Sequence, residues 1–270
     1  MATLAEQLHE LKSYDTVTVR KGEGIGEIIL NRPEKLNPLG KKMMTDLQQA
    51  ITVVADDAEI KVVVITGAGR AFSAGGDIED MRGGAFALSR EEMRSMHTWM
   101  MHLANLDKPV IAMVNGVAAG VGVNLALMCD IIVASDKASF IQAFVNIGLV
   151  PDFGGLWSLP RAVGTHKAKE LMMLGDPVTA DEALRIGLVN RVVPADQLEP
   201  TVRELALRLS KQPQRSVRMI KSIVDRGYGL PLDTVLEWEA EAQDICGHTE
   251  DFVEGTTAFL EKRKAVFKGR

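Results

Sequence analysis

Residues 71–78 read Ala71-Phe72-Ser73-Ala74-Gly75-Gly76-Asp77-Ile78, a segment with two adjacent glycines at its centre. The β-branched run Val62–Thr66 comes shortly before this segment and is typical of a fully buried strand. Two adjacent glycines past a strand let the backbone approach a ligand closely. Free backbone N–H groups at such a point can bind negative charge that develops during a reaction.

A second glycine-rich segment follows a second apolar strand. Gly116–Gly122 links the strand expected at Val110–Val114 to a helix expected at Val123–Cys129. Two amides that converge from two such segments can stabilise an enolate or another oxyanion without any side chain. The alternative is that both segments are only tight turns. Nucleotide binding is not indicated, because Gly67–Phe72 lacks the third small residue of a dinucleotide fingerprint and no GxxxxGK[ST] motif occurs.

Hydrophobic periodicity predicts a mixed α/β core followed by helices. A hairpin is expected from Thr16–Arg20 and Glu27–Leu30, and an amphipathic helix from Leu39–Ala55. Another helix at Glu91–Leu106 and a strand at Ile131–Ala134 suggest parallel crossover units. The helices expected from residue 165 onward are Lys167–Leu174, Ala180–Ile186, Gln197–Leu209, Ser216–Arg226, Leu232–Ile245 and Glu250–Val266. We therefore expect an α/β core in residues 1–200 and a C-terminal helical segment in residues 201–270.

The composition is that of an ordinary globular protein. The chain has 270 residues, of which 46% are hydrophobic and 25% are charged. Its net charge of −5 disfavours nucleic acid as a partner, since phosphate binding depends on clustered positive charge. Cys129 and Cys246 form no CxxC motif and are expected to be free thiols, and no metal-ligand spacing occurs.

Neither secretion nor membrane insertion is expected. The segment Met1–Lys21 lacks the continuous apolar region of a signal peptide. The most apolar segment, Val110–Ala134, is interrupted by Asn115, Asn124 and Asp130, so it falls short of a membrane span. We expect a cytoplasmic protein with no membrane partner.

Several segments together resemble the crotonase family, the enoyl-CoA hydratases and isomerases. Residues 71–78 look like the first signature of the family. The other similar segments are Asn31–Asn37, Lys108–Gly116 with Gly120, Gly122, Asn124 and Cys129-Asp130, Ala180–Ala183, Gly187–Val189 and Ala258–Lys264. The resemblance implies a crotonase-like ββα spiral core, a C-terminal helical trimerisation segment, and a homotrimer or a hexamer made of two trimers. It also implies an acyl-CoA thioester substrate, with coenzyme A as part of the substrate and no separate cofactor.

The resemblance also assigns the binding residues. The two oxyanion-hole amides would be the backbone N–H groups of Gly76 and Val121. The family usually has glycine where Val121 stands, so the isopropyl group would narrow the pocket near the thioester while the backbone donor is retained. The residues implied to contact coenzyme A are Lys35, Leu36, Ala74, Asp77 and Ile78, with Lys264 and Phe267 matching a lysine and an aromatic residue of the last helix.

The chain departs from the family hydratases at the positions of their two glutamates. Aligned on the signatures, these positions are Asn124 and Phe144. Asparagine does not exchange a proton near neutral pH and phenylalanine has no polar group, so neither residue can activate a water molecule.

A carboxylate appears further along, at Asp152. The segment Gly148–Arg161 looks like the branch that includes the phenylacetate-pathway isomerase, whose acid/base is an aspartate at this position. Flanking Val150, Phe153 and Phe144 are expected to desolvate Asp152 and to raise its pKa. The alternative is that Asp152 caps the turn that follows.

Together these residues predict an acyl-CoA isomerase that shifts a double bond from the 3-enoyl to the 2-enoyl position. The amides of Gly76 and Val121 would bind the thioester carbonyl, while Asp152 removes a proton at C2 and returns it at C4. One alternative is an enoyl-CoA hydratase of fatty acid or aromatic acid degradation, which would use Asp152 and a bound water. Another is a catalytically weak acyl-CoA-binding subunit.

Overall fold

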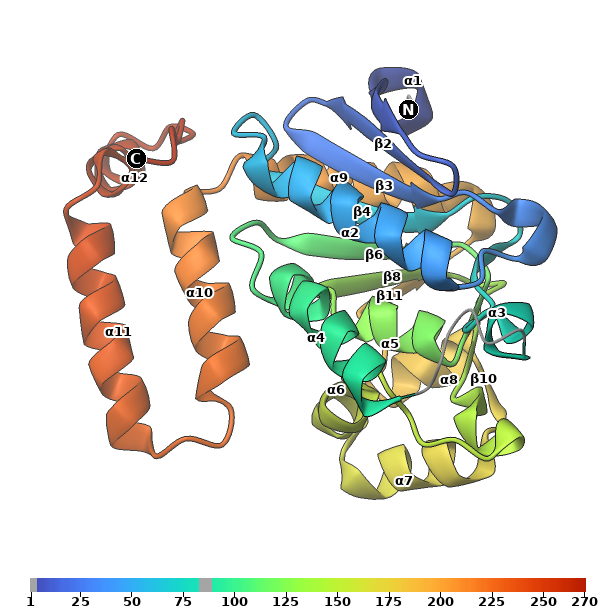
Figure 1. Ribbon diagram of the computed structural model, residues 1–270. Helices are drawn as coiled ribbons and strands as arrows, with labels where there is room; N and C mark the ends of the chain where they lie inside the picture. Colours follow the sequence, from blue (N-terminus) through green and yellow to red (C-terminus); the bar gives the residue numbers. More distant parts are fainter. Residues whose placement is uncertain (1–3, 83–88) are drawn as a thin grey trace.

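The core of the molecule is built on a mixed sheet of seven strands (Figure 1). The computed structural model describes residues 4–82 and 89–270. The N-terminal strands of this sheet pair antiparallel, whereas all pairs from β3 onward are parallel. In spatial order the strands are β1 (His9–Ser13), β2 (Val17–Gly22), β3 (Ile25–Leu30), β4 (Val62–Gly67), β6 (Val110–Val114), β8 (Ile131–Ser135) and β11 (Arg191–Val193).

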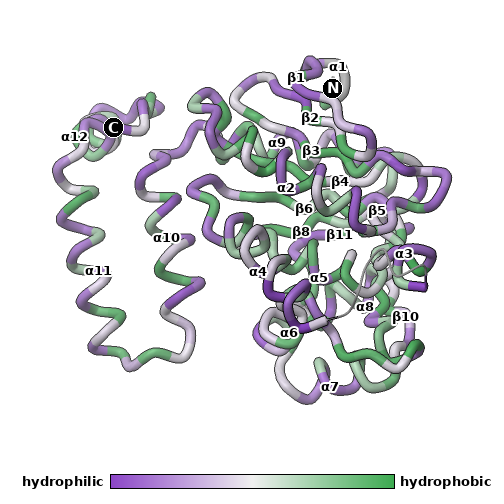
Figure 2. The backbone as a smooth tube through the Cα atoms, viewed as in Figure 1, coloured by the Kyte–Doolittle hydropathy of each residue, from purple (hydrophilic) through white to green (hydrophobic). Residues whose placement is uncertain are grey.

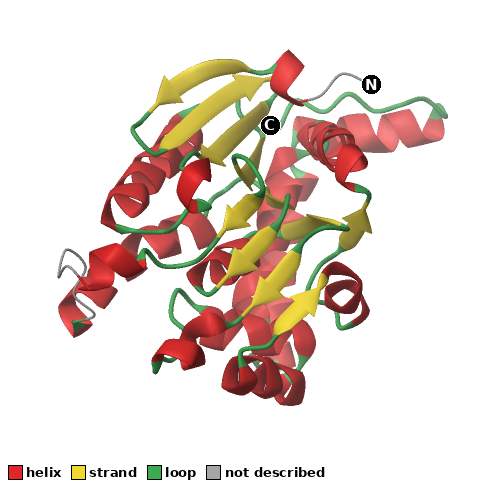
Figure 3. Cartoon of the chain, turned by 90° about the vertical axis from the view of Figure 1, so that its right-hand side faces the viewer, coloured by secondary structure: helices red, strands yellow, loops and turns green. Residues whose placement is uncertain are grey.

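A second, four-stranded sheet contains short strands that the periodicity did not predict, and β1 and β11 of the first sheet were not predicted either. In spatial order the strands of the second sheet are β10 (Pro177–Thr179), β9 (Ser139–Ile141), β7 (Val117–Ala119) and β5 (Ala71–Ser73). Along the chain, β4 is followed by β5, β6 by β7 and β8 by β9, so each turn of the chain gives one strand to each sheet. Helices follow these strand pairs, and this arrangement is the expected ββα spiral (Figure 3).

The helices up to residue 210 lie around the two sheets, and those that follow form the C-terminal part of the described chain (Figure 1). The helices are α1 (Leu4–Gln7), α2 (Lys41–Asp56), α3 (Ile78–Arg82), α4 (Arg90–Ala104), α5 (Val121–Leu127), α6 (Gly155–Val163), α7 (Thr165–Leu174), α8 (Ala180–Arg185), α9 (Leu198–Ser210), α10 (Gln214–Gly227), α11 (Leu232–Gly247) and α12 (Glu250–Leu260). Short 3-10 turns occupy Pro33–Lys35, Ala143–Ile147 and Ala195–Gln197. Among the described residues, none of these helices has the length and apolar character needed to cross a bilayer.

Alternate side chains of the buried strands pack in two separate hydrophobic clusters. Val62 and Val64 of β4 pack with α9, whereas Val63 and Ile65 pack in the larger cluster with α2 and α4. The strand β4 is buried at every position, which explains why its sequence is a continuous apolar run. The α/β core expected from the sequence is confirmed.

Residues 214–270 form a C-terminal arm, made of α10, α11, α12 and the segment after them, that extends away from the sheets (Figure 1). The expected boundary between residues 200 and 201 lies inside α9, which packs on the sheet. The part of the chain that extends away from the sheets therefore begins at α10. Hydrophobic residues recur along α10 and α11 (Figure 2) although neither helix has a buried residue. The last helix was expected to reach Val266 but ends at Leu260, because Lys262 has a positive φ of 55°.

Candidate active site

Two glycines bring the loops that carry the two predicted amides into contact. Gly75 follows β5 and Gly120 follows β7, and these strands are parallel neighbours. Both glycines have positive φ, 99° and 49°. A Cβ placed on Gly75 would lie 2.9 Å from the carbonyl oxygen of Ala119, and one on Gly120 would lie 4.0 Å from the Gly75 Cα. The two loops therefore cross in contact, and each is followed at once by a predicted donor, Gly76 or Val121.

The amides of Gly76 and Val121 are not used in holding the fold. Within the described part of the chain, neither N–H donates to another backbone carbonyl or to a side chain. The backbone on either side is fixed, since Leu39 N donates to Gly75 O (2.7 Å) and Gly120 N donates to Ile141 O (2.7 Å). Two fixed and unused N–H groups on crossing loops are suited to bind an oxyanion.

Three of the residues implied to contact coenzyme A lie beside the first loop. Lys35 ends a 3-10 turn, and Leu36 follows it in the left-handed conformation with φ of 63°. Ala74 N donates to Leu36 O (2.8 Å). Buried Asn37 locks this contact, because its side chain donates to the backbone of Ala68 and Ala71 (2.9 Å each). The structure thus brings Lys35, Leu36 and Ala74 together.

Asp77 and Ile78 continue the same loop into α3. Asp77 is buried, and its carboxylate accepts hydrogen bonds from Arg32 Nη1 (3.2 Å) and Glu79 N (3.0 Å). Its side chain therefore holds the start of α3 in place. Ile78 is 49% exposed beside it and is available for contact with a ligand.

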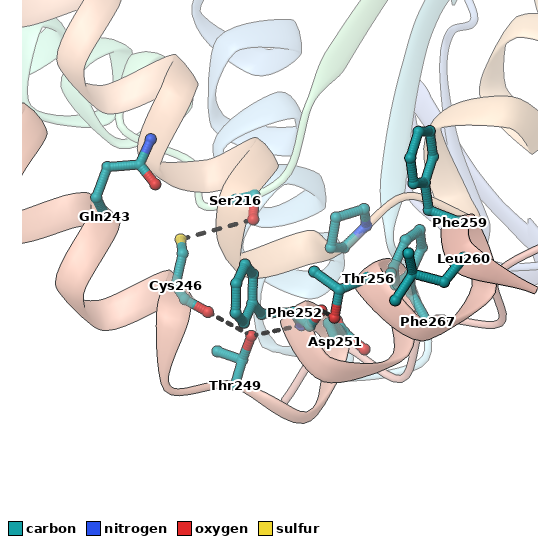
Figure 4. Close-up of a pocket in the computed structure, with 12 residues that line it drawn as sticks. Ser216, Gln243, Cys246, Thr249, Asp251, Phe252, Thr256, Phe259, Leu260 and Phe267 are labelled. Carbon is teal, nitrogen blue, oxygen red and sulfur yellow. Dashed lines mark hydrogen bonds between the residues drawn. The ribbon is translucent and has the colours of Figure 1, made fainter.

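Lys264 and Phe267 lie in the C-terminal arm, which is remote in the single chain from the residues named above (Figure 1). Lys264 is exposed. Phe267 lines a pocket of about 660 Å³ between α10, α11 and α12 that includes none of Gly76, Val121 and Asp152 (Figure 4). One chain does not bring these two residues to the crossing loops.

Asp152 lies in the loop before α6 with a carboxylate that is only partly solvated. Its Oδ1 is buried and has no hydrogen-bond partner among the described residues. Burial raises the pKa of Asp152 to about 6. The turn that follows is closed by Gly155 N donating to the backbone oxygen of Asp152 (2.8 Å), so the carboxylate is not the capping group.

The hydrophobic side chains around Asp152 agree in part with those expected. Phe153 and Phe144 are buried, but Val150 is 73% exposed, so its expected contribution to desolvating Asp152 is wrong for the single chain. Phe153 has a positive φ of 50°, and its ring packs edge-on against Trp99 of α4 with centroids 4.8 Å apart. A Cβ on Gly120 would lie 3.7 Å from the Phe144 ring, which places this ring against the second loop.

Asn124 and Gln142 make contacts that the sequence did not reveal. Asn124 is fully buried in α5, and its Nδ2 donates to the backbone oxygen of Asp152 (2.8 Å). Gln142 Nε2 donates to Asn124 Oδ1 (2.8 Å). These bonds join segments that are far apart along the chain, so no local pattern could have indicated them. In residues 4–82 and 89–270 no group of three or more His, Cys, Asp and Glu side chains is arranged to hold a metal ion.

The chain is similar to known proteins along most of its length. The family model described as enoyl-CoA hydratase/isomerase matches residues 20–270. A crotonyl-CoA hydratase of Syntrophomonas wolfei is 40% identical over 94% of this chain and 98% of its own, and a 1,2-epoxyphenylacetyl-CoA isomerase of Escherichia coli is 39% identical over 92% and 96%. The crystal structure of enoyl-CoA hydratase subunit I from Geobacillus kaustophilus superposes with a TM-score of 0.90 at 36% identity, covering 96% of this chain and 100% of the other. The chain belongs to the crotonase family of enoyl-CoA hydratases and isomerases.

Proposed function

We propose that this protein is an acyl-CoA isomerase that converts a 3-enoyl-CoA into a 2-enoyl-CoA. The observation that carries the proposal is the Asp152 carboxylate, whose Oδ1 is buried and unpartnered among the described residues. A carboxylate in this condition is a suitable proton carrier near neutral pH, because desolvation brings its pKa to about 6. The crossing loops supply the proposed oxyanion donors, Gly76 N and Val121 N.

The proposed reaction needs a single proton carrier. The Asp152 carboxylate accepts the proton from C2, and the electrons of the broken C–H bond pass into the thioester oxygen to form a dienolate. Hydrogen bonds from Gly76 and Val121 stabilise that oxygen, and each such donor is typically worth about 3–4 kcal/mol of barrier. Asp152 then returns the proton to C4, and the new double bond lies between C2 and C3. No water is consumed.

A hydratase is the second candidate, because the relatives include a crotonyl-CoA hydratase and a short-chain-enoyl-CoA hydratase. Hydration requires that a water molecule be activated and that a proton be delivered to carbon. The Asn124 amide is bonded at both ends to protein groups, and Phe144 offers no polar atom. Any hydration would therefore depend on Asp152 alone, and we expect it to be slower by orders of magnitude than in an enzyme with two glutamates.

The substrate and assembly are part of the proposal. We propose an acyl-CoA thioester bound along Lys35, Leu36, Ala74 and Ile78, with no cofactor besides the coenzyme A of the substrate. We also propose a homotrimer or a hexamer. Since one chain keeps Lys264 and Phe267 away from these residues, the two could contribute only if another subunit supplied them.

The test compares 3-enoyl-CoA and crotonyl-CoA as substrates for the purified protein and for Asp152→Asn. We expect isomerisation to exceed hydration clearly, and to fall by roughly 10²–10⁴-fold in the variant, the usual worth of a positioned proton carrier. Asp136→Asn is the matched control, since the Asp136 carboxylate lies outside the proposed site and accepts a hydrogen bond from Ala195 N (3.1 Å).

Three results would contradict the proposal in different ways. Hydration at the rate of an ordinary hydratase would favour the hydratase. No turnover of either substrate, with acyl-CoA still bound, would favour the weakly catalytic subunit. An Asp152→Asn variant with more than about a third of the isomerase rate, a barrier change below ~1 kcal/mol, would remove Asp152 from the mechanism.

A further inference from the structure

Asn124 is a buried polar residue to which the proposed reaction gives no role. It lies in α5, one turn beyond Val121. Its amide donates to the main chain of Asp152 and accepts from Gln142, both at 2.8 Å. Burying a polar side chain costs free energy unless its hydrogen bonds are made. Here both the nitrogen and the oxygen of the Asn124 amide are hydrogen-bonded. One of those bonds ends on the backbone of the proposed base.

This side chain joins the two halves of the proposed site. Gln142 directly follows Ile141, whose carbonyl accepts the Gly120 N–H (2.7 Å). The end of β9 therefore fixes both the start of α5 and the orientation of the Asn124 amide. The contact with the Asp152 loop is close, because a Cβ placed on Gly155 would lie 2.4 Å from Asn124 Nδ2. Only glycine at position 155 lets the loop approach the amide this closely.

The loop that carries Asp152 also has a strained backbone. Phe153 has φ of 50° and Gly154 has φ of 74°. The left-handed region is unfavourable for phenylalanine and persists only where the surroundings enforce it. The Trp99 ring holds Phe153 on one side, and Asn124 holds the Asp152 carbonyl on the other. Without the Asn124 bond, the loop is free to relax and to move the carboxylate.

We infer that Asn124 is a positioning residue, which holds the Asp152 carboxylate at a fixed distance from the Val121 amide, with Gln142 orienting the Asn124 side chain. This inference rests on the proposed role of Asp152 as the acid/base. At the position where the resemblance places a glutamate of the hydratases, the chain then has a residue that fixes geometry and moves no proton.

The test is Asn124→Ala. We expect kcat for isomerisation to fall by about 10- to 100-fold, since a displacement of about 1 Å at a catalytic group costs this much, with KM changed little. The acid limb of the kcat/KM profile should move to lower pH, because the released loop solvates the carboxylate. Asn190→Ala is the matched control. It removes one hydrogen bond, which Ile132 N donates to Asn190 Oδ1 (2.7 Å), and should leave kcat and the pH profile unchanged.

A double variant separates this inference from the proposed function. If Asn124 acts only through Asp152, adding Asn124→Ala to Asp152→Asn should lower kcat no further. If Asp152→Asn alone keeps the wild-type rate, the proposed function fails. If Asp152→Asn is inactive but Asn124→Ala keeps kcat within threefold with an unmoved acid limb, only the positioning role fails.

Two further outcomes are decisive. Equal losses of kcat and Tm in Asn124→Ala and Asn190→Ala would show a general loss of stability and overturn the inference. Should Asn124→Ala not fold, Gln142→Ala carries the test, because it leaves Asn124 in place but frees its Oδ1. We expect a smaller fall in kcat and the same direction of pH shift, and an unchanged profile would contradict the inference.

Discussion

Asp152 differs from Asp77, the buried carboxylate of the first loop, in having a buried oxygen with no hydrogen-bond partner among the described residues. Asp77 is also buried, but its two oxygens hold Arg32 and α3. The Asp152 Oδ1 has no partner among the described residues, and burial raises the pKa of this carboxyl group. A group that is saturated by structural hydrogen bonds is poorly placed to exchange protons, so the difference in bonding distinguishes the two roles.

The proposed role of Asp152 as the base predicts how isomerisation depends on pH. The base acts in its ionised form, and its pKa in the free enzyme is about 6. We expect kcat/KM to be constant above that pH and to fall tenfold per pH unit below it. A profile recorded with 3-enoyl-CoA from pH 4.5 to 8, with folding checked at each pH, tests this. A rate that stays flat down to pH 4.5 would assign the proton transfer to another group.

At the scale of the elements, the candidate site depends on two short parallel strands, β5 and β7, because the loops that follow them lie in contact. We expect Gly75→Ala to lower kcat by about 10- to 100-fold, because a Cβ 2.9 Å from Ala119 O must push the loops apart. Gly229→Ala is the matched control. Gly229 has a similar φ of 88° and nothing within 4 Å of the added carbon. Both variants should lose about 1–3 kcal/mol of stability, while only the first should lose activity.

The sequence predicts most of the longer elements but leaves out the helix α6, the strand β1 and the three-residue strands. The run Val62–Thr66 identifies β4 because a strand buried on both faces is continuously apolar. The three-residue strands β5, β7 and β9 are too short for any periodicity, yet the two loops of the candidate site follow β5 and β7, and β9 accepts the Gly120 N–H of the second loop. Gly76, Val121 and Asp152 are predicted as site residues through the resemblance and stay predictions, whereas the contact of Asn124 with Asp152 exists only in the folded chain.

At the scale of the whole molecule, the C-terminal arm is attached to the core by polar contacts. Lys221 Nζ lies 2.9 Å from Asp130 Oδ2, Arg218 Nη1 lies 2.9 Å from Asp107 Oδ2, and Arg226 donates to Asn105 (3.1 Å). Large apolar side chains of the arm remain uncovered, among them Leu232 at 73%, Phe259 at 83% and Leu260 at 79% exposed. Exposed apolar groups of this size are typical of a surface that is covered in an assembly.

The uncovered apolar surface indicates an assembly, and the family resemblance implies a trimer or a hexamer, which we expect in solution. Sedimentation equilibrium at micromolar concentration measures this directly. Val224→Asp adds a charge to the exposed apolar side of α10, where Val224 is 66% exposed, and should weaken the assembly. A wild-type protein that sediments as a monomer would contradict the prediction.

The proposed donor at position 121 can be removed by one kind of substitution. Val121 is the first residue of α5, a position where helices accept proline, and proline has no N–H. We expect Val121→Pro to lower kcat by about 10²–10³-fold with the fold retained. Val121→Ala, the control, keeps the N–H and should remain within a few-fold of the wild-type rate. Equal rates in the two variants would exclude this amide from the oxyanion hole.

The main-chain origin of the proposed donor also affects how such a site can evolve. Because the donor at position 121 belongs to the main chain, every missense change except one to proline leaves it in place. Val121 is 4% exposed and packs in the larger hydrophobic cluster, so other apolar side chains are the substitutions that the core accepts there, and each of them keeps the proposed catalytic contact. Under the proposed function, such apolar substitutions would change the size of the group beside the thioester, and so the acyl groups admitted, while the donor is retained.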